Sequence, residues 1–254
     1  MCGIFGISLK KGSSYSKEDI DFLINHLSTH AESRGKDSSG IATVNLAKKI
    51  TSIIKSSTSI SNLIKNPLFQ KQYLSTLQSF PSSNPLVLFG HSRLVTNGSQ
   101  LDHHNNQPVI KGNIVSIHNG IIVNDKALWN QNKDLERQYE IDTEIFNSLV
   151  SKYISSESFA SSVVKAAKKL EGTLSTVVFS KLGSELVLYT NNSSLHYMTN
   201  SHDFLVFSSE KSTLVHLNNV SKFSGNKFHI HTINPKEGIL HDFDTFDISE
   251  LSNS

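Results

Sequence analysis

Apolar residues in the first third of the chain follow two different periodicities. Residues 4–9 form an almost continuous apolar run typical of a buried strand, and 17–31 carry apolar residues at helical spacing. Cys2 is therefore expected at the start of a strand. The same patterns predict strands over 40–46 and 50–55, a serine-rich loop over 56–61 and short helices within 60–79.

Two later apolar runs lead straight into polar motifs that contain glycine. The runs cover 86–89 and 113–117, so we expect both motifs at strand ends. Strands, then helices, then strands again predict two packed sheets with helices outside. The expected helices cover 142–154 and 157–170, and the later strands cover 173–180, 184–190, 195–199, 204–208 and 227–233.

Length and composition indicate one domain. The chain has 254 residues, of which 37% are hydrophobic, enough for one sizeable core but not for a second catalytic domain. We assign the domain to 2–240 and treat 241–254, which carry no motif, as a C-terminal tail. A net charge of +2 is too small to indicate a nucleic-acid or membrane partner.

The sequence also predicts the compartment and the absence of cofactors. No basic region followed by an apolar stretch opens the chain, and no run of ~18 apolar residues occurs. The single cysteine excludes an internal disulfide, so we expect a cytoplasmic protein. His103 and His104 lack nearby acidic or cysteine partners, and no Gly-Lys-Ser/Thr follows the glycines, so we predict no metal and no nucleotide. The sequence does not decide whether the protein forms a homo-oligomer.

Cys2 is the main candidate for a nucleophile, because it directly follows the initiator methionine. Removal of Met1 gives the same residue a thiol and a free α-amine. The amine titrates near ~8 and the thiol near ~8.5, so the amine can take the thiol proton directly or through a water. The alternative is a small buried apolar residue without chemistry.

Three further glycine-containing motifs follow Cys2-Gly3. Residues 34–40 read Arg-Gly-Lys-Asp-Ser-Ser-Gly, 90–98 read Gly-His-Ser-Arg-Leu-Val-Thr-Asn-Gly, and 118–120 read His-Asn-Gly. In this order and spacing the four motifs resemble the class II glutamine amidotransferases, in particular the glutaminase domains of glucosamine-6-phosphate synthase and amidophosphoribosyltransferase. The resemblance implies an α+β fold, the four-layer αββα sandwich of the N-terminal nucleophile (Ntn) hydrolases.

Glutamine presents a side-chain amide, an α-carboxylate and an α-ammonium group, and the motifs offer a partner for each. The guanidinium of Arg93 is a planar fork suited to the α-carboxylate. The resemblance implies an oxyanion hole made by the Asn119 side chain and the Gly120 backbone, with Arg34 beside Cys2. It also assigns Thr96 to the α-carboxylate and Asp142 to the α-ammonium group, and Asn97 and His118 complete the predicted substrate-binding set.

Some of these residues have other interpretations. Asp142 also fits the N-cap of the helix that follows it, and Arg93 also fits a structural ion pair. His91 and His118 are alternative catalytic bases, although the α-amine of Cys2 makes another base unnecessary. Leu94 and Asn97 depart from the glucosamine-6-phosphate synthase type, which has an aromatic residue and a histidine there.

Three functions are compatible with the motifs. The first is a glutaminase that releases ammonia for a partner enzyme by way of a γ-glutamyl thioester on Cys2. The second is a hydrolase of a γ-glutamyl amide or related small amide that needs no ammonia acceptor. The third is a non-catalytic binding module on an Ntn scaffold, against which the intact Cys2, Arg93 and Asn119 count.

Overall fold

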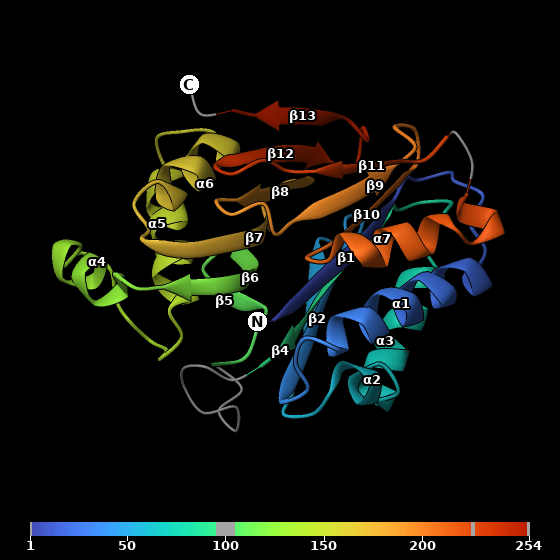
Figure 1. Ribbon diagram of the computed structural model, residues 1–254, viewed down its shortest axis with the longest axis horizontal. Helices are drawn as coiled ribbons and strands as arrows, with labels where there is room; N and C mark the ends of the chain where they lie inside the picture. The colour runs from blue at the N-terminus through green and yellow to red at the C-terminus, as the bar shows by residue number, and fades with distance from the viewer. Residues whose placement is uncertain (1, 95–104, 225–226, 253–254) are drawn as a thin grey trace.

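The computed structural model describes residues 2–94, 105–224 and 227–252. Its strands form two antiparallel sheets that lie face to face, with helices over the outer face of each (Figure 1). One hydrophobic cluster joins helices to the first sheet, a second joins the two sheets, and a third joins the second sheet to its helices. Three interfaces require four layers, so the predicted αββα sandwich is confirmed.

The first sheet has β1 (Gly3–Leu9) near its middle, between β10 (Phe204–Ser208) and β4 (Leu86–Arg93). The strand order is β11-β9-β10-β1-β4-β2-β3. The other strands are β2 (Ser38–Asn45), β3 (Ile50–Ser56), β9 (His196–Thr199) and β11 (His229–Thr232), and the helices are α1 (Lys17–Glu32), α2 (Ile60–Leu63), α3 (Pro67–Leu77), α7 (Lys211–Asn218) and the short η2 (Ser221–Phe223).

The second sheet has the order β13-β12-β8-β7-β6-β5. Its strand β6 (Ile114–Ile122) lies close to both β1 and β4 across the sandwich. The other elements are β5 (Val109–Lys111), β7 (Gly172–Ser180), β8 (Glu185–Thr190), β12 (Glu237–Asp242) and β13 (Ile248–Leu251), with α4 (Asp125–Gln131), α5 (Thr143–Tyr153) and α6 (Phe159–Ala167).

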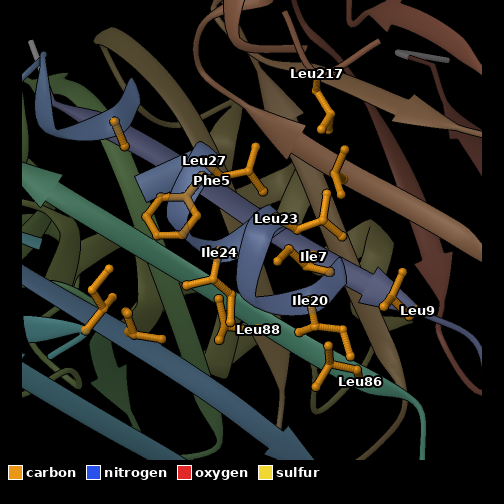
Figure 2. Packing of buried hydrophobic residues seen from close by; sticks show 14 of the residues in the cluster. Phe5, Ile7, Leu9, Ile20, Leu23, Ile24, Leu27, Leu86, Leu88 and Leu217 are labelled. Atoms are coloured by element: carbon orange, nitrogen blue, oxygen red, sulfur yellow. The ribbon is translucent and has the colours of Figure 1, made fainter. Parts of the chain in front are cut away.

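Side chains along β1 alternate between the two faces of the first sheet. Ile4 belongs to the cluster between the sheets. Cys2 is two residues earlier, so the same alternation turns its side chain toward the second sheet. On the opposite face, Phe5, Ile7 and Leu9 pack against Ile20, Leu23, Ile24 and Leu27 of α1 (Figure 2).

Helix α1 carries the chain from the far end of β1 back to Cys2. It begins with a capping box, in which Ser16 Oγ accepts from the Asp19 N–H and the Asp19 carboxylate accepts from the Ser16 N–H. Near its end, a Cβ on Gly3 would lie 2.4 Å from the carbonyl oxygen of Ala31. The glycine beside Cys2 therefore lets the helix end pack directly on the strand, and the turn that follows brings Arg34 to the site.

The strands before two motifs are longer than the sequence predicted. β4 includes residues 90–93 and β6 includes 118–120, so these residues lie inside strands and not after strand ends. Their polar side chains are buried in clusters of hydrogen bonds, which interrupts the apolar pattern that marks a strand. The predicted helices over 17–31, 142–154 and 157–170 correspond to α1, α5 and α6.

The C-terminal residues differ from the expected tail. The end of β12 and all of β13 lie beyond residue 240, and β13 pairs with β12 so that Glu250 is opposite Ile239. The second sheet therefore extends to Leu251. None of the helices in the described ranges is long and apolar enough to cross a membrane.

Candidate active site

Cys2 and Asn119 meet between the two sheets. The backbone nitrogen of Cys2 donates to Asn119 Oδ1 at 3.0 Å, although 117 positions separate the two residues along the chain. The Cys2 thiol donates to the carbonyl oxygen of Leu94 at 3.7 Å. The candidate nucleophile is thus held by Asn119 of the second sheet and by the residue that follows β4 of the first sheet.

The surroundings of the Cys2 thiol act on its pKa in opposite directions. Burial is the largest effect and raises this pKa above its usual value, whereas the hydrogen bond to Leu94 and the positive charges of Arg93 and Arg34 lower it. Arg34 itself forms an ion pair with Glu210, which follows β10 and precedes α7. The two arginines of the motifs therefore both favour the thiolate, as the attacking form requires.

Arg93 is the last residue of β4 and is only 4% exposed. Its Nη1 donates to Asn106 Oδ1 at 2.8 Å. Burial lowers the pKa of Arg93, and the charges of Cys2, Asp142 and Asp37 oppose that shift. The guanidinium of Arg93 therefore lies near both the nucleophile and Asp142. In this position it can form a bidentate ion pair with a substrate carboxylate.

Asn119 and Gly120 occupy consecutive positions on β6. The Nδ2 of Asn119 has no hydrogen-bond partner among the residues described, so this donor is available to an oxyanion. Gly120 has a φ of 150°, and a Cβ there would lie 2.0 Å from the carbonyl oxygen of Thr173. Only glycine fits at this position, because any side chain would force β6 away from β7.

The ring of His118 turns away from Cys2. Its Nδ1 lies 3.1 Å from Thr143 Oγ1 on α5, and its Nε2 lies 3.2 Å from the carbonyl oxygen of Thr173. Neighbouring residues of a strand point to opposite faces, so His118 faces the helices when Asn119 faces the site. Among the described members of the predicted substrate-binding set, Asp142 is the one near this ring, because Thr143 Oγ1 also donates to Asp142 Oδ1 at 3.4 Å.

His91 is unsuited to proton transfer, as its ring is fully buried in β4. Burial lowers its pKa to about 3, and the opposing contribution from the backbone of His118 is the smallest of the effects on this ring. A group this weakly basic takes up no proton near neutral pH.

Asp142 stands at the N-cap position of α5, but its carboxylate makes no capping hydrogen bond. Instead Oδ2 accepts from the Ile122 N–H at 2.8 Å, at the end of β6. The residue lines a cavity of about 550 Å³. Other residues lining this cavity are Ile121, Val123, Asp125, Arg137 and Glu140.

Several predictions fall beyond what the structure describes. Thr96, Asn97, His103 and His104 lie outside the described residues. Within those ranges, no group of three His, Cys, Asp or Glu side chains could hold a metal ion. Leu94, where the resemblance expected an aromatic residue, is 43% exposed at the edge of the site.

Sequence reasoning missed two groups of residues that the structure brings to the site. Glu210 pairs with Arg34, and the buried amides at 105–107 contact Arg93, His118 and Glu140. Residues 207–210 resemble the family only loosely and 105–107 carry no motif, and the partners of both groups are far away in the sequence.

Comparison with known proteins identifies this arrangement. Residues 91–216 match a glutamine amidotransferase domain. The isomerizing glutamine–fructose-6-phosphate aminotransferase of Wigglesworthia glossinidia brevipalpis is 31% identical over 182 residues, 70% of this chain and 27% of that protein. The chain belongs to the class II glutamine amidotransferases. It spans about a quarter of the length of the curated relatives it matches.

Solved structures of the family have the same fold. The glutamine phosphoribosylpyrophosphate amidotransferase of B. subtilis aligns with a TM-score of 0.70 and 18% identity, covering 100% of this chain and 50% of that one. The allosteric regulatory enzyme of purine biosynthesis aligns with a TM-score of 0.71 and 19% identity over the same shares. These likenesses show the fold, and the matching domain and the 31% identical relative confirm the resemblance inferred from the four motifs.

Proposed function

We propose that this glutamine amidotransferase hydrolyses the side-chain amide of glutamine through Cys2 and releases ammonia for a partner enzyme. The observation that carries this proposal is the 3.0 Å contact between the Cys2 nitrogen and Asn119 Oδ1. This contact places Cys2, the proposed nucleophile, next to Asn119, the proposed oxyanion donor from the opposite sheet. The same contact occupies the oxygen of Asn119, which leaves its Nδ2 to point toward the substrate.

The reaction begins with the thiol proton. After removal of Met1, the α-amine of Cys2 accepts this proton and the thiolate attacks the amide carbon of glutamine. The carbonyl oxygen becomes an oxyanion, which accepts hydrogen bonds from Asn119 Nδ2 and the Gly120 N–H. The protonated amine then gives its proton to the leaving nitrogen, so that ammonia departs and a γ-glutamyl thioester remains on Cys2.

Hydrolysis of the thioester restores the enzyme. The α-amine takes a proton from a water molecule, whose oxygen attacks the thioester carbon and forms a second oxyanion in the same hole. When this intermediate collapses, the carbon–sulfur bond breaks, the thiol regains its proton and glutamate leaves. One base and one oxyanion hole therefore serve both halves of the reaction.

The two ends of glutamine are held by opposite charges. Arg93, with Thr96 and Asn97, binds the α-carboxylate, and Asp142 binds the α-ammonium group. The negative charge of Asp142 acts on the pKa of Arg93, so opposite charges are available near each other for the two ends of glutamine. His118 keeps a supporting role, since its ring contacts Thr143 beside Asp142.

The ammonia acceptor is a separate question from glutamine hydrolysis. The relative from Wigglesworthia is named for amino transfer to fructose 6-phosphate, and this chain covers 27% of it. We propose an acceptor enzyme that works beside this domain in the cytoplasm, where a free thiol persists. Hydrolysis of another γ-glutamyl amide without an acceptor is the second candidate, because the Cys2–Asn119 contact would serve that reaction equally well.

A glutaminase assay on the purified chain tests the proposal. Glutamate release should need Cys2 and should be lost in Cys2→Ala, while mass spectrometry shows Met1 to be absent from the active form. A glutamine analogue with an electrophilic diazo-ketone should add its mass to Cys2. Labelling at another residue, or Cys2→Ala with more than about a tenth of the parent rate, would overturn the assignment. Adding candidate acceptor enzymes separates the two functions.

A further inference from the structure

Three consecutive buried amides precede β5. Asn105, Asn106 and Gln107 are 1%, 0% and 5% exposed. Amide side chains usually lie at the surface, because a buried amide without hydrogen-bond partners destabilises the fold. Three in a row therefore require specific partners, and each of the three finds its partner in a different part of the site.

Asn106 holds the predicted carboxylate-binding arginine. Its Oδ1 accepts from Arg93 Nη1 at 2.8 Å and from Ser38 Oγ at 2.8 Å. Ser38 and Arg93 are opposite each other in the pairing of β2 and β4. One oxygen thus ties the guanidinium to the neighbouring strand, which fixes the direction of its planar fork.

Gln107 holds the strand that carries the oxyanion donor. Its Nε2 donates to the carbonyl oxygen of His118 at 2.9 Å, and its Oε1 accepts from the His118 N–H. The strand pairing of β5 with β6 begins only at Val109, opposite Ser116. The Gln107 side chain therefore continues the hydrogen-bond ladder beyond the end of β5, next to Asn119.

Asn105 holds the loop that leads to Asp142. Its Nδ2 donates to Glu140 Oε2 at 3.0 Å, and its Oδ1 accepts from the Glu140 N–H at 3.1 Å. The second of these hydrogen bonds fixes the backbone two residues before Asp142, and the first fixes the Glu140 side chain. Glu140 also lines the cavity that Asp142 lines.

We propose that Asn105, Asn106 and Gln107 form a positioning segment that aligns the three functional parts of the site with one another. The proposal rests on the proposed function, since its three targets are the α-ammonium partner, the α-carboxylate partner and the oxyanion hole. The three amides act through other residues and do not touch the substrate. Because they are consecutive, a shift of one moves the others, and the three parts keep their mutual spacing.

Single alanine substitutions should give three different kinetic signatures. Asn106→Ala should raise KM for glutamine about tenfold, the scale of one hydrogen bond to a charged group, and leave KM for γ-aminobutyramide, which lacks the carboxylate, unchanged. Asn105→Ala should raise KM for glutamine but not for glutaramate, which lacks the amino group. Gln107→Ala should lower kcat about tenfold with little change in KM, because its effect reaches Asn119.

Asn84→Ala is the matched control. Asn84 is 1% exposed, accepts from the Ala47 N–H at 2.7 Å and donates to Asn45 Oδ1 at 3.2 Å, in a loop away from the site. This variant should lose stability while KM and kcat stay at the parent values. Equal changes of KM and kcat in all three segment variants, or lower stability alone, would overturn the positioning role.

A second measurement does not depend on turnover. The chain has three arginines, so the side-chain NMR signals of Arg93 can be assigned against Arg34 and Arg137. The Nη1 hydrogens of Arg93 should be visible in the parent and in Asn84→Ala, and exchange-broadened in Asn106→Ala. Unchanged signals in Asn106→Ala overturn the positioning proposal even in an inactive protein. A parent that hydrolyses no glutamine but shows the expected signals refutes only the proposed function.

Discussion

Replacement of Asn119 by aspartate separates the two hydrogen bonds that this side chain makes available. The carboxylate keeps an oxygen for the Cys2 nitrogen, which lies 3.0 Å from Oδ1 in the parent. It loses the Nδ2 donor that the oxyanion needs. The shape of the side chain is almost unchanged, so the packing between β1 and β6 should survive.

The expected loss follows from the missing donor. Removing one oxyanion-hole donor costs ~10²–10³ in kcat, or ~2.7–4 kcal/mol, and an added carboxylate beside the developing negative charge increases this loss. KM should change little, because the donor meets the oxygen mainly in the transition state. The new negative charge also raises the pKa of the Cys2 thiol, against the lowering by Arg93 and Arg34.

Initial rates of glutamate release across a range of pH values measure both effects. Attack requires the thiolate, so the rise of kcat/KM with pH should move to higher pH in Asn119→Asp and stay in place in Asn119→Ala. Both variants should lose kcat, and Asn84→Ala should lose none. A rise in KM at constant kcat would refute the assignment of Asn119 to the oxyanion hole.

Three further results are expected. Arg93→Lys keeps the charge but loses the bidentate hydrogen bonds to the α-carboxylate, so KM for glutamine should rise about ten- to a hundredfold. Turnover of γ-aminobutyramide, which lacks this carboxylate, should not fall. Asp142→Asn should raise KM for glutamine but not for glutaramate. The pKa of His241 is about 4 because of burial, so the unfolded state binds more protons below pH 6.5 and stability falls toward pH 4. Denaturant titrations should show a shallower fall in His241→Gln.

Much of the architecture and chemistry could be predicted from the sequence. Apolar spacing located β1 and the helices α1, α5 and α6, because helix and strand periods are properties of neighbouring residues. Cys2 was identifiable because its chemistry depends only on its place after Met1. The motif order was sufficient to identify the family, since a motif and its place along the chain are properties of the sequence itself.

Contacts between distant residues were decided by the tertiary structure alone. Cys2 and Asn119 meet through the packing of one sheet on the other, over a separation of 117 positions. Asp142 looked like a helix cap, but its carboxylate bonds to the Ile122 N–H because β6 ends beside α5. Local sequence propensities cannot predict either contact, since both depend on sheet register and on the stacking of layers.

The same reason explains the elements that the sequence did not predict. Residues 90–93 and 118–120 continue β4 and β6 because their polar side chains find buried partners on other strands and helices. β13 is a four-residue edge strand that exists through its pairing with β12. Asn105, Asn106 and Gln107 look like an ordinary polar loop until Glu140, Arg93 and His118 surround them. The sequence by itself determined which groups are available, and the packing of the four layers decided which of them meet.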